Sequence, residues 1–193
     1  LQKRARLGLF VRGIEDPFAD CTALSSQEQS VLRPVLECIE QAGLKESVDF
    51  LDIRSQQDLA SAYRYFANRK SVFALTAFYE PFGLAPIEAA ACGLAVVATS
   101  NGGPSEIFED GSGVTVDPFD TDAICKGLIE TLDNFSHYSV LGMKRVETKY
   151  TWDKKALGYF KAIEECVAQQ PVAFDSVEEP DGSEILLRYL QSA

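Results

Sequence analysis

The segment from residue 71 to residue 93 places the strongest constraint on the fold of this chain. The apolar run Ser71–Ala77 is typical of a buried β-strand, and a turn that contains Pro81 and Gly83 follows it. The Ala-rich stretch up to Gly93 favours a helix. A strand joined to a helix by a short turn is the basic unit of parallel α/β sheets, so the segment predicts that fold class.

Two glutamates mark this turn and the helix after it. Glu80 stands in the turn, and Glu88 lies eight positions later, about two helical turns further on. Both carboxylates are expected near the carboxyl end of the strand, where open α/β sheets bind ligands. Gly83 lets the backbone approach a ligand, and the first N–H groups of the helix are donors for an anion. An ordinary strand–loop–helix unit with two surface glutamates is the alternative.

The rest of the chain repeats the order strand, then helix. Strands are predicted at residues 7–11, 48–53, 71–77, 94–99 and 114–116. Helices are predicted from the capping box at Ser25 to Gly43, and at residues 56–68, 121–132 and 153–168, with a short one at Glu106. This alternation implies right-handed crossovers and a Rossmann-like, mostly parallel sheet flanked by helices.

Composition limits the classes of partner. The chain has 193 residues, 46% of them hydrophobic, which suits one domain with at most a small appendage. A net charge of −11 argues against nucleic acid and anionic membranes as partners. Any anion must then be held by local positive potential at a helix N-terminus and at a few basic side chains.

The sequence indicates neither a targeting signal nor a histidine-rich metal site. No apolar stretch is long enough to span a membrane and no signal peptide begins the chain, so a cytoplasmic location is expected. The single histidine, His137, argues against a histidine-rich metal site, and no cofactor is expected. Widely spaced, odd-numbered cysteines indicate reduced thiols: Cys21, Cys38, Cys92, Cys125 and Cys166.

The run Glu80-Pro81-Phe82-Gly83-Leu84, with Glu88 beyond it, resembles the E-x7-E signature of retaining GT-B glycosyltransferases of family 4. The resemblance implies that the chain is the C-terminal half of a GT-B fold, which binds a nucleotide-sugar donor. It implies that Glu80, the expected catalytic residue, holds hydroxyls of the donor hexose and that Glu88 holds those of the ribose. Carboxylates suit both tasks because they accept hydrogen bonds from vicinal hydroxyls.

The resemblance also assigns the other donor contacts. Gly83 and Leu84 would give backbone N–H groups to phosphate or sugar, and Ile53 and Ser55 would border the uracil. Gly13 would lie under the donor, although a plain turn glycine explains it equally well. The turn Asn101-Gly102-Gly103-Pro104 either approaches the donor sugar or is simply a tight strand-to-helix turn. The full set of expected donor-binding residues is Gly13, Ile53, Ser55, Phe82, Gly83, Leu84 and Glu88.

Longer runs resemble the sucrose-phosphate synthase branch of family 4: residues 12–18, 55–60, 71–80, 101–107 and 150–152. That branch transfers glucose from UDP-glucose to fructose 6-phosphate with retention. Residues 1–170 are therefore expected to form a C-terminal donor domain that is incomplete at its N-terminus, without the family's Arg/Lys pair. Residues 171–193 are expected to be an acidic linker and a short apolar tail. The sugar-phosphate acceptor would bind through the missing N-terminal domain, so the isolated chain is expected to be inactive.

Three other functions remain open from the sequence. Another family 4 transferase, such as a mannosyltransferase, would use a GDP- or ADP-sugar, because E-x7-E does not read the base. A non-catalytic nucleotide-sugar-binding module is a second alternative. A generic Rossmann-like domain is the third, but no G-x-G-x-x-G follows the first strand and no P-loop motif occurs.

Overall fold

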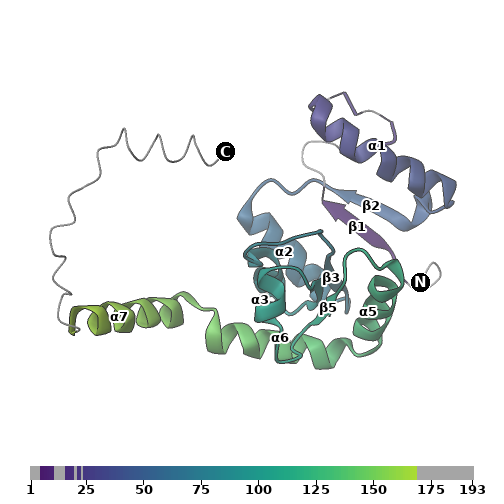
Figure 1. The fold of residues 1–193 in the computed structure, drawn as a ribbon. Helices are drawn as coiled ribbons and strands as arrows, with labels where there is room; N and C mark the ends of the chain where they lie inside the picture. The colour runs from purple at the N-terminus through teal and green to yellow at the C-terminus, as the bar shows by residue number, and fades with distance from the viewer. Residues whose placement is uncertain (1–4, 11–15, 20, 23, 169–193) are drawn as a thin grey trace, which may run out of the picture. The chain divides into compact units, whose positions relative to one another are not determined.

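The computed structural model describes residues 5–10, 16–19, 21–22 and 24–168 (Figure 1). The chain divides into two compact units, Leu1–Tyr150 and Thr151–Ala193. All described strands belong to the first unit, and they run parallel to their neighbours in two sheets. The predicted α/β class with parallel strands flanked by helices is confirmed.

The first sheet has two strands. Strand β1 (Leu7–Phe10) pairs with β2 (Val48–Leu51), and Leu7 lies opposite Val48. Helix α1 (Ser26–Gln41) and the 3₁₀ turn η1 (Lys45–Ser47) connect them. The predicted capping box is present, since the Ser25 N–H donates to the Glu28 carboxylate at 2.9 Å and the Glu28 N–H donates to Ser25 Oγ at 3.3 Å.

The second sheet has the strand order β3–β4–β5, with β3 at Val72–Leu75, β4 at Ala95–Thr99 and β5 at Val114–Val116. Helix α2 (Gln56–Ala67) precedes β3, α3 (Leu84–Ala91) joins β3 to β4, and α4 (Gly103–Ile107) leads toward β5. Helices α5 (Thr121–Asp133) and α6 (Phe135–Lys149) complete the unit. No pairing joins β1 to β3 within the described residues, so the predicted single sheet is present as two.

Strand β4 is the centre of the core. All five of its residues are buried, as expected for a near-continuous apolar strand covered on both faces. Val97 faces α5, because a Cβ on Gly127 would lie 3.7 Å from it, whereas Val96 belongs to the cluster on the other face. Helix α3 packs closely there, and its Ala89 and Ala90 have no exposed surface.

Helix α7 (Trp152–Ala168) belongs to the second unit and confirms the predicted C-terminal helix. None of its described side chains is buried. The apolar residues Leu157, Phe160 and Ile163 of this helix are all more than half exposed. Among the described residues, no helix combines the length and the apolar composition needed to cross a membrane.

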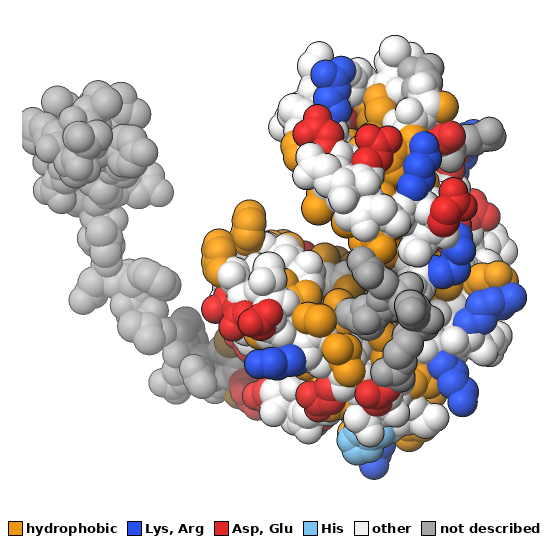
Figure 2. Space-filling model, turned by 90° about the vertical axis from the view of Figure 1, so that its right-hand side faces the viewer, with side chains coloured by type: hydrophobic (Ala, Val, Ile, Leu, Met, Phe, Trp, Pro, Cys, Tyr) orange, Lys and Arg blue, Asp and Glu red, His pale blue; other side chains and the backbone are white. Residues whose placement is uncertain are grey.

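The charged side chains on one face of the molecule are distributed rather than segregated. On the face drawn in Figure 2, acidic and basic side chains are interspersed, and no broad basic area is visible. Together with the net charge of −11, this distribution gives polyanions no extended surface to bind on that face.

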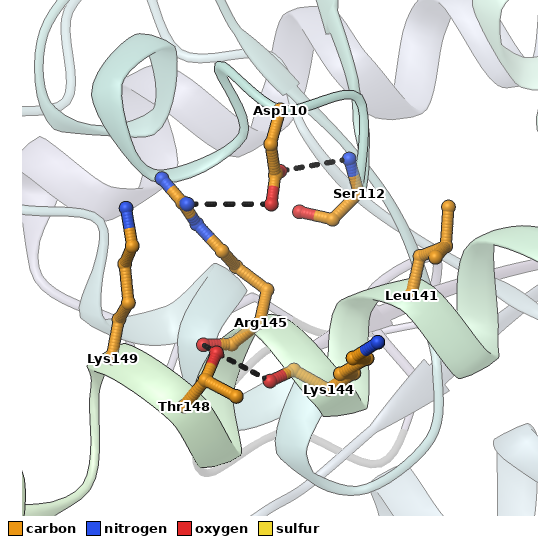
Figure 3. Close-up of a pocket in the computed structure, with 7 residues that line it drawn as sticks. All are labelled: Asp110, Ser112, Leu141, Lys144, Arg145, Thr148 and Lys149. Atoms are coloured by element: carbon orange, nitrogen blue, oxygen red, sulfur yellow. Dashed lines mark hydrogen bonds and ion pairs between the residues drawn. The ribbon is translucent and has the colours of Figure 1, made fainter.

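Arg145 on α6 ties the end of α4 to the core. Its side chain is 6% exposed and donates from Nε to the Ile107 carbonyl at 2.8 Å and from Nη2 to the Glu106 carbonyl at 3.1 Å. Figure 3 shows it leaving α6 and reaching Asp110, whose carboxylate lies 3.3 Å from Nη1. It borders a cavity of about 320 Å³, and a second of about 370 Å³ lies beside Lys70 and residues 132–137. Neither cavity includes a residue of the loop that carries Glu80.

We predict that Arg145→Ala lowers the free energy of unfolding by about 3 kcal/mol, because it leaves the buried Ile107 carbonyl and the partly buried Glu106 carbonyl without their donor. Urea unfolding followed by circular dichroism measures this change. Lys144→Ala, one position earlier on the same helix and exposed, is the control and should change stability by less than about 0.5 kcal/mol. Equal effects of the two substitutions would contradict the anchoring role of Arg145.

Candidate functional site

The loops after β3 and β4 are joined at Glu80. The Glu80 N–H donates to the Asn101 carbonyl at 3.0 Å, and the Gly103 N–H donates to the Glu80 carbonyl at 2.9 Å. Glu80 and Gly102 thereby form an isolated parallel bridge. The Asn101 side chain adds a third bond, since its Nδ2 donates to the Phe78 carbonyl at 3.0 Å. The two loops hold each other at the carboxyl ends of neighbouring parallel strands.

Two glycines permit this contact. Gly102 has φ +104°, which strains any other residue, and a Cβ there would lie 2.1 Å from the Glu80 carbonyl oxygen. A Cβ on Gly103 would lie 2.5 Å from the Phe82 carbonyl oxygen. The contact between the loops therefore accounts for the Gly-Gly pair as a tight turn, one of the two explanations that the sequence left open.

The Glu80 carboxylate lies at the N-terminus of α3. Its Oε1 accepts hydrogen bonds from the N–H of Gly83 at 2.9 Å and of Phe82 at 3.2 Å. Gly83, the N-cap residue, has φ +79° and offers no capping side chain. Glu80 thus takes over the capping task, so the Gly83 N–H that we expected to be free for a ligand is already engaged.

Glu88 lies on the same helix and is exposed. Burial raises the pKa of Tyr63 on α2 to about 12, and the charges of Glu88 and Cys92 add to this effect. Glu80 and Glu88 stand at the start and in the middle of one helix, as the sequence predicted.

The remaining predicted donor-binding residues have no described hydrogen bond to Glu80. Ser55 is the N-cap of α2: its hydroxyl accepts from the Asp58 N–H at 3.0 Å and donates to the Asp58 carboxylate at 2.7 Å. Ile53 and Ser55 follow the carboxyl end of β2, and no described hydrogen bond connects either to Glu80. Gly13 lies outside the described residues. Leu84, the first residue of α3, is 66% exposed.

An aromatic surface that sequence reasoning missed borders the loop. The rings of Phe78 and Phe119 stack in parallel, with centroids 4.8 Å apart, although the two residues are 68% and 70% exposed. Tyr79 and Phe82 are equally exposed. Phe119 follows β5 and Phe78 follows β3, so this surface spans loops from two strands. The only signal in the sequence was the aromatic residue after the Asp117-Pro118 turn.

Parallel strands with intervening helices, and loops that bond to each other at the carboxyl ends of β3 and β4, define a Rossmann-like α/β domain. The sequence profile of the family "Glycosyl transferases group 1" matches residues 27–144, more than half of the chain. The chain belongs to this family.

Two relatives carry names of the same enzyme. A protein from Thermosipho melanesiensis named probable sucrose-phosphate synthase is 38% identical over 156 residues, which cover 80% of this chain. Probable sucrose-phosphate synthase 3 from Arabidopsis thaliana is 38% identical over 156 residues, which cover 79%. The chain spans only 36% and 15% of the lengths of these two relatives.

Solved structures share the fold. The sucrose-phosphate synthase of Thermosynechococcus elongatus superposes with a TM-score of 0.63 at 23% identity, covering 86% of this chain and 46% of that one. An Anabaena protein solved in complex with UDP gives a TM-score of 0.62 at 20% identity, covering 84% and 48% of the two chains.

We predict that Gly102→Ala destabilises the protein by about 3 kcal/mol, because the methyl group meets backbone at an already strained φ. Gly43→Ala is the matched control: Gly43 also has positive φ, +64°, but open space around its Cβ position. Its cost should stay near 1 kcal/mol. Denaturant unfolding of both variants measures the difference, and similar costs would mean that the loops do not depend on the close approach at Gly102.

The electrostatic link between Glu88 and Tyr63 gives a second prediction. The folded pKa of Tyr63, about 12, exceeds its ordinary value of 10.0, so its contribution to stability is complete below pH 10 and is lost as the pH rises through 12. Glu88→Gln should lower the pKa of Tyr63 but leave it above 10, because burial is the larger cause. Absorbance titration at about 295 nm, with Tyr63→Phe as the reference, measures this. An unchanged titration would mean that Glu88 points away from Tyr63.

Proposed function

We propose that this chain is the donor-binding part of a retaining hexosyltransferase, namely a sucrose-phosphate synthase. The complete enzyme would transfer glucose from UDP-glucose to fructose 6-phosphate and release UDP. The observation that carries the proposal is the Glu80 carboxylate fixed at the start of the helix that also bears Glu88. Support comes from the names of the two relatives and from UDP in the Anabaena structure.

Each proposed role follows from the chemistry of the group. Glu80 accepts hydrogen bonds from hexose hydroxyls, and Glu88, further along α3, accepts them from the ribose. The exposed start of α3, at Leu84, faces the diphosphate. Ile53 and Ser55, after β2, border the base through backbone atoms, while the Ser55 hydroxyl caps α2. Gly13 keeps its proposed place under the donor.

Catalysis in such an enzyme requires stabilisation of the departing UDP and placement of the acceptor oxygen. Neither glutamate needs to act as a nucleophile. The acceptor site, its sugar-phosphate ligand and a cytoplasmic location belong to the same proposal. So does the division into a donor domain at residues 1–170 and an acidic linker with an apolar tail at residues 171–193. The alternatives within the family are a transferase that uses a GDP- or ADP-sugar and a non-catalytic nucleotide-sugar-binding module.

We predict that this chain binds UDP more tightly than GDP or ADP in calorimetric titrations. Glu88→Ala should weaken UDP binding about tenfold, because a hydrogen bond to a charged group contributes about 1.5 kcal/mol or more. Glu147→Ala, at an exposed glutamate on α6, is the control and should leave the affinity unchanged.

Preference for GDP or ADP would redirect the proposal to another member of the family. Equal losses in Glu88→Ala and Glu147→Ala would exclude a specific ribose contact. No binding of any nucleotide up to millimolar concentration would overturn donor binding by this chain alone, and the same titration on the longer protein would then test the enzyme itself.

A further inference from the structure

Glu80 is held by the protein through almost every polar group that it has. Its N–H and carbonyl are bonded to Asn101 and Gly103, and its Oε1 accepts from both Phe82 and Gly83. Within the described residues, no hydrogen bond or ion pair reaches Oε2, the second carboxylate oxygen. Glu80 is partly buried and is fixed by four hydrogen bonds, two at its backbone and two at Oε1, so its carboxylate keeps a single open acceptor atom, Oε2.

We propose that the N–H groups of Phe82 and Gly83 are positioning groups for Glu80 and do not bind the donor's phosphates. They hold Oε1, and in doing so they direct Oε2 at a hydroxyl of the donor hexose. This inference rests on the proposed nucleotide-sugar site and refines it, because family resemblance had given the Gly83 N–H to the ligand.

Energetics favour this arrangement over one in which a phosphate displaces the carboxylate. Hydrogen bonds from N–H to a carboxylate are charge-assisted and stronger than neutral ones. A phosphate that took these two donors would release Oε1 without a new partner, whereas a hydroxyl that binds Oε2 breaks nothing. The Glu80 backbone is fixed to Asn101 and Gly103, so the side chain has little freedom to move aside.

The first turn of α3 has few backbone N–H groups that are free to bind a phosphate. Of the residues after the N-cap Gly83, Leu84 and Ala85 have N–H groups for which no hydrogen bond is described, and Pro86 has none to offer. The next N–H, that of Ile87, already donates to the Gly83 carbonyl at 3.3 Å. Any backbone contact between α3 and the diphosphate therefore falls to Leu84 and Ala85.

The first test needs no ligand. Amide nitrogen–proton NMR spectra of the wild type, Glu80→Gln and Glu80→Ala report directly on the Gly83 N–H. A glutamine oxygen can still accept this bond, so the Gly83 signal should move little in Glu80→Gln and strongly in Glu80→Ala. A Gly83 signal that is the same in all three proteins would overturn the proposal. The remaining signals show whether each variant is folded.

The second test measures affinities for UDP and UDP-glucose. It decides whether the N–H groups of Phe82 and Gly83 hold Glu80 or bind the donor's phosphates. Glu80→Ala should weaken UDP-glucose binding about tenfold and Glu80→Gln about threefold, while UDP affinity stays within twofold in both. In the wild type, UDP should shift the Leu84 and Ala85 amides more than those of Phe82 and Gly83.

A fivefold gain in UDP affinity for Glu80→Ala would overturn the proposal, because it would mean that the carboxylate competes with phosphate for the two amides. Equal losses for UDP and UDP-glucose would also overturn it, since Glu80 would then only support the loop. If the wild type binds neither probe, the proposed function fails, and the ligand-free spectra still decide whether the amides hold Glu80.

Discussion

The backbone contact between the loops after β3 and β4 is the constraint on which the rest of the site depends. It requires parallel strands whose carboxyl ends emerge side by side, and it requires glycine at both positions of closest approach. Once the contact is made, Glu80 has a fixed backbone, and Gly83 follows at the position where α3 must begin. The orientation of the carboxylate, the capping of α3 and the place of Glu88 all follow from this one contact.

The strands pair in two separate sheets, and helix α2 packs against strands of both. The described strands form two parallel sheets, with the order β2–β1 in one and β3–β4–β5 in the other. Helix α2 contacts both sheets through Tyr63. The centroid of its ring lies 6.2 Å from that of Phe10 on β1 and 5.6 Å from that of Phe73 on β3. Phe10 and Leu7 are 43% and 50% exposed, although an apolar run of this kind is usually buried on both faces.

Local patterns predicted the elements and failed at contacts between them. Capping signals at Ser25 and Ser55 and the apolar runs gave most helices and strands within one or two residues. The spacing correctly placed Glu80 in the turn before α3 and Glu88 on that helix. Three interactions could not be predicted because they depend on how the folded chain brings the groups involved together. They are the hydrogen bond from Gly83 to Glu80, the Phe78–Phe119 stack and the effect of the Glu88 charge on Tyr63. A motif records which residue types a site needs, but not which of their atoms the protein itself uses.

The charge at the start of α3 depends on the Glu80 carboxylate, which the protein itself binds there. A helix N-terminus carries roughly half a positive charge, and the Glu80 carboxylate beside it carries a full negative one. The pair therefore carries roughly half a negative charge, so a diphosphate at the start of α3 needs cationic groups nearby. In a chain of net charge −11, the cations that offset such a ligand have to come from other groups.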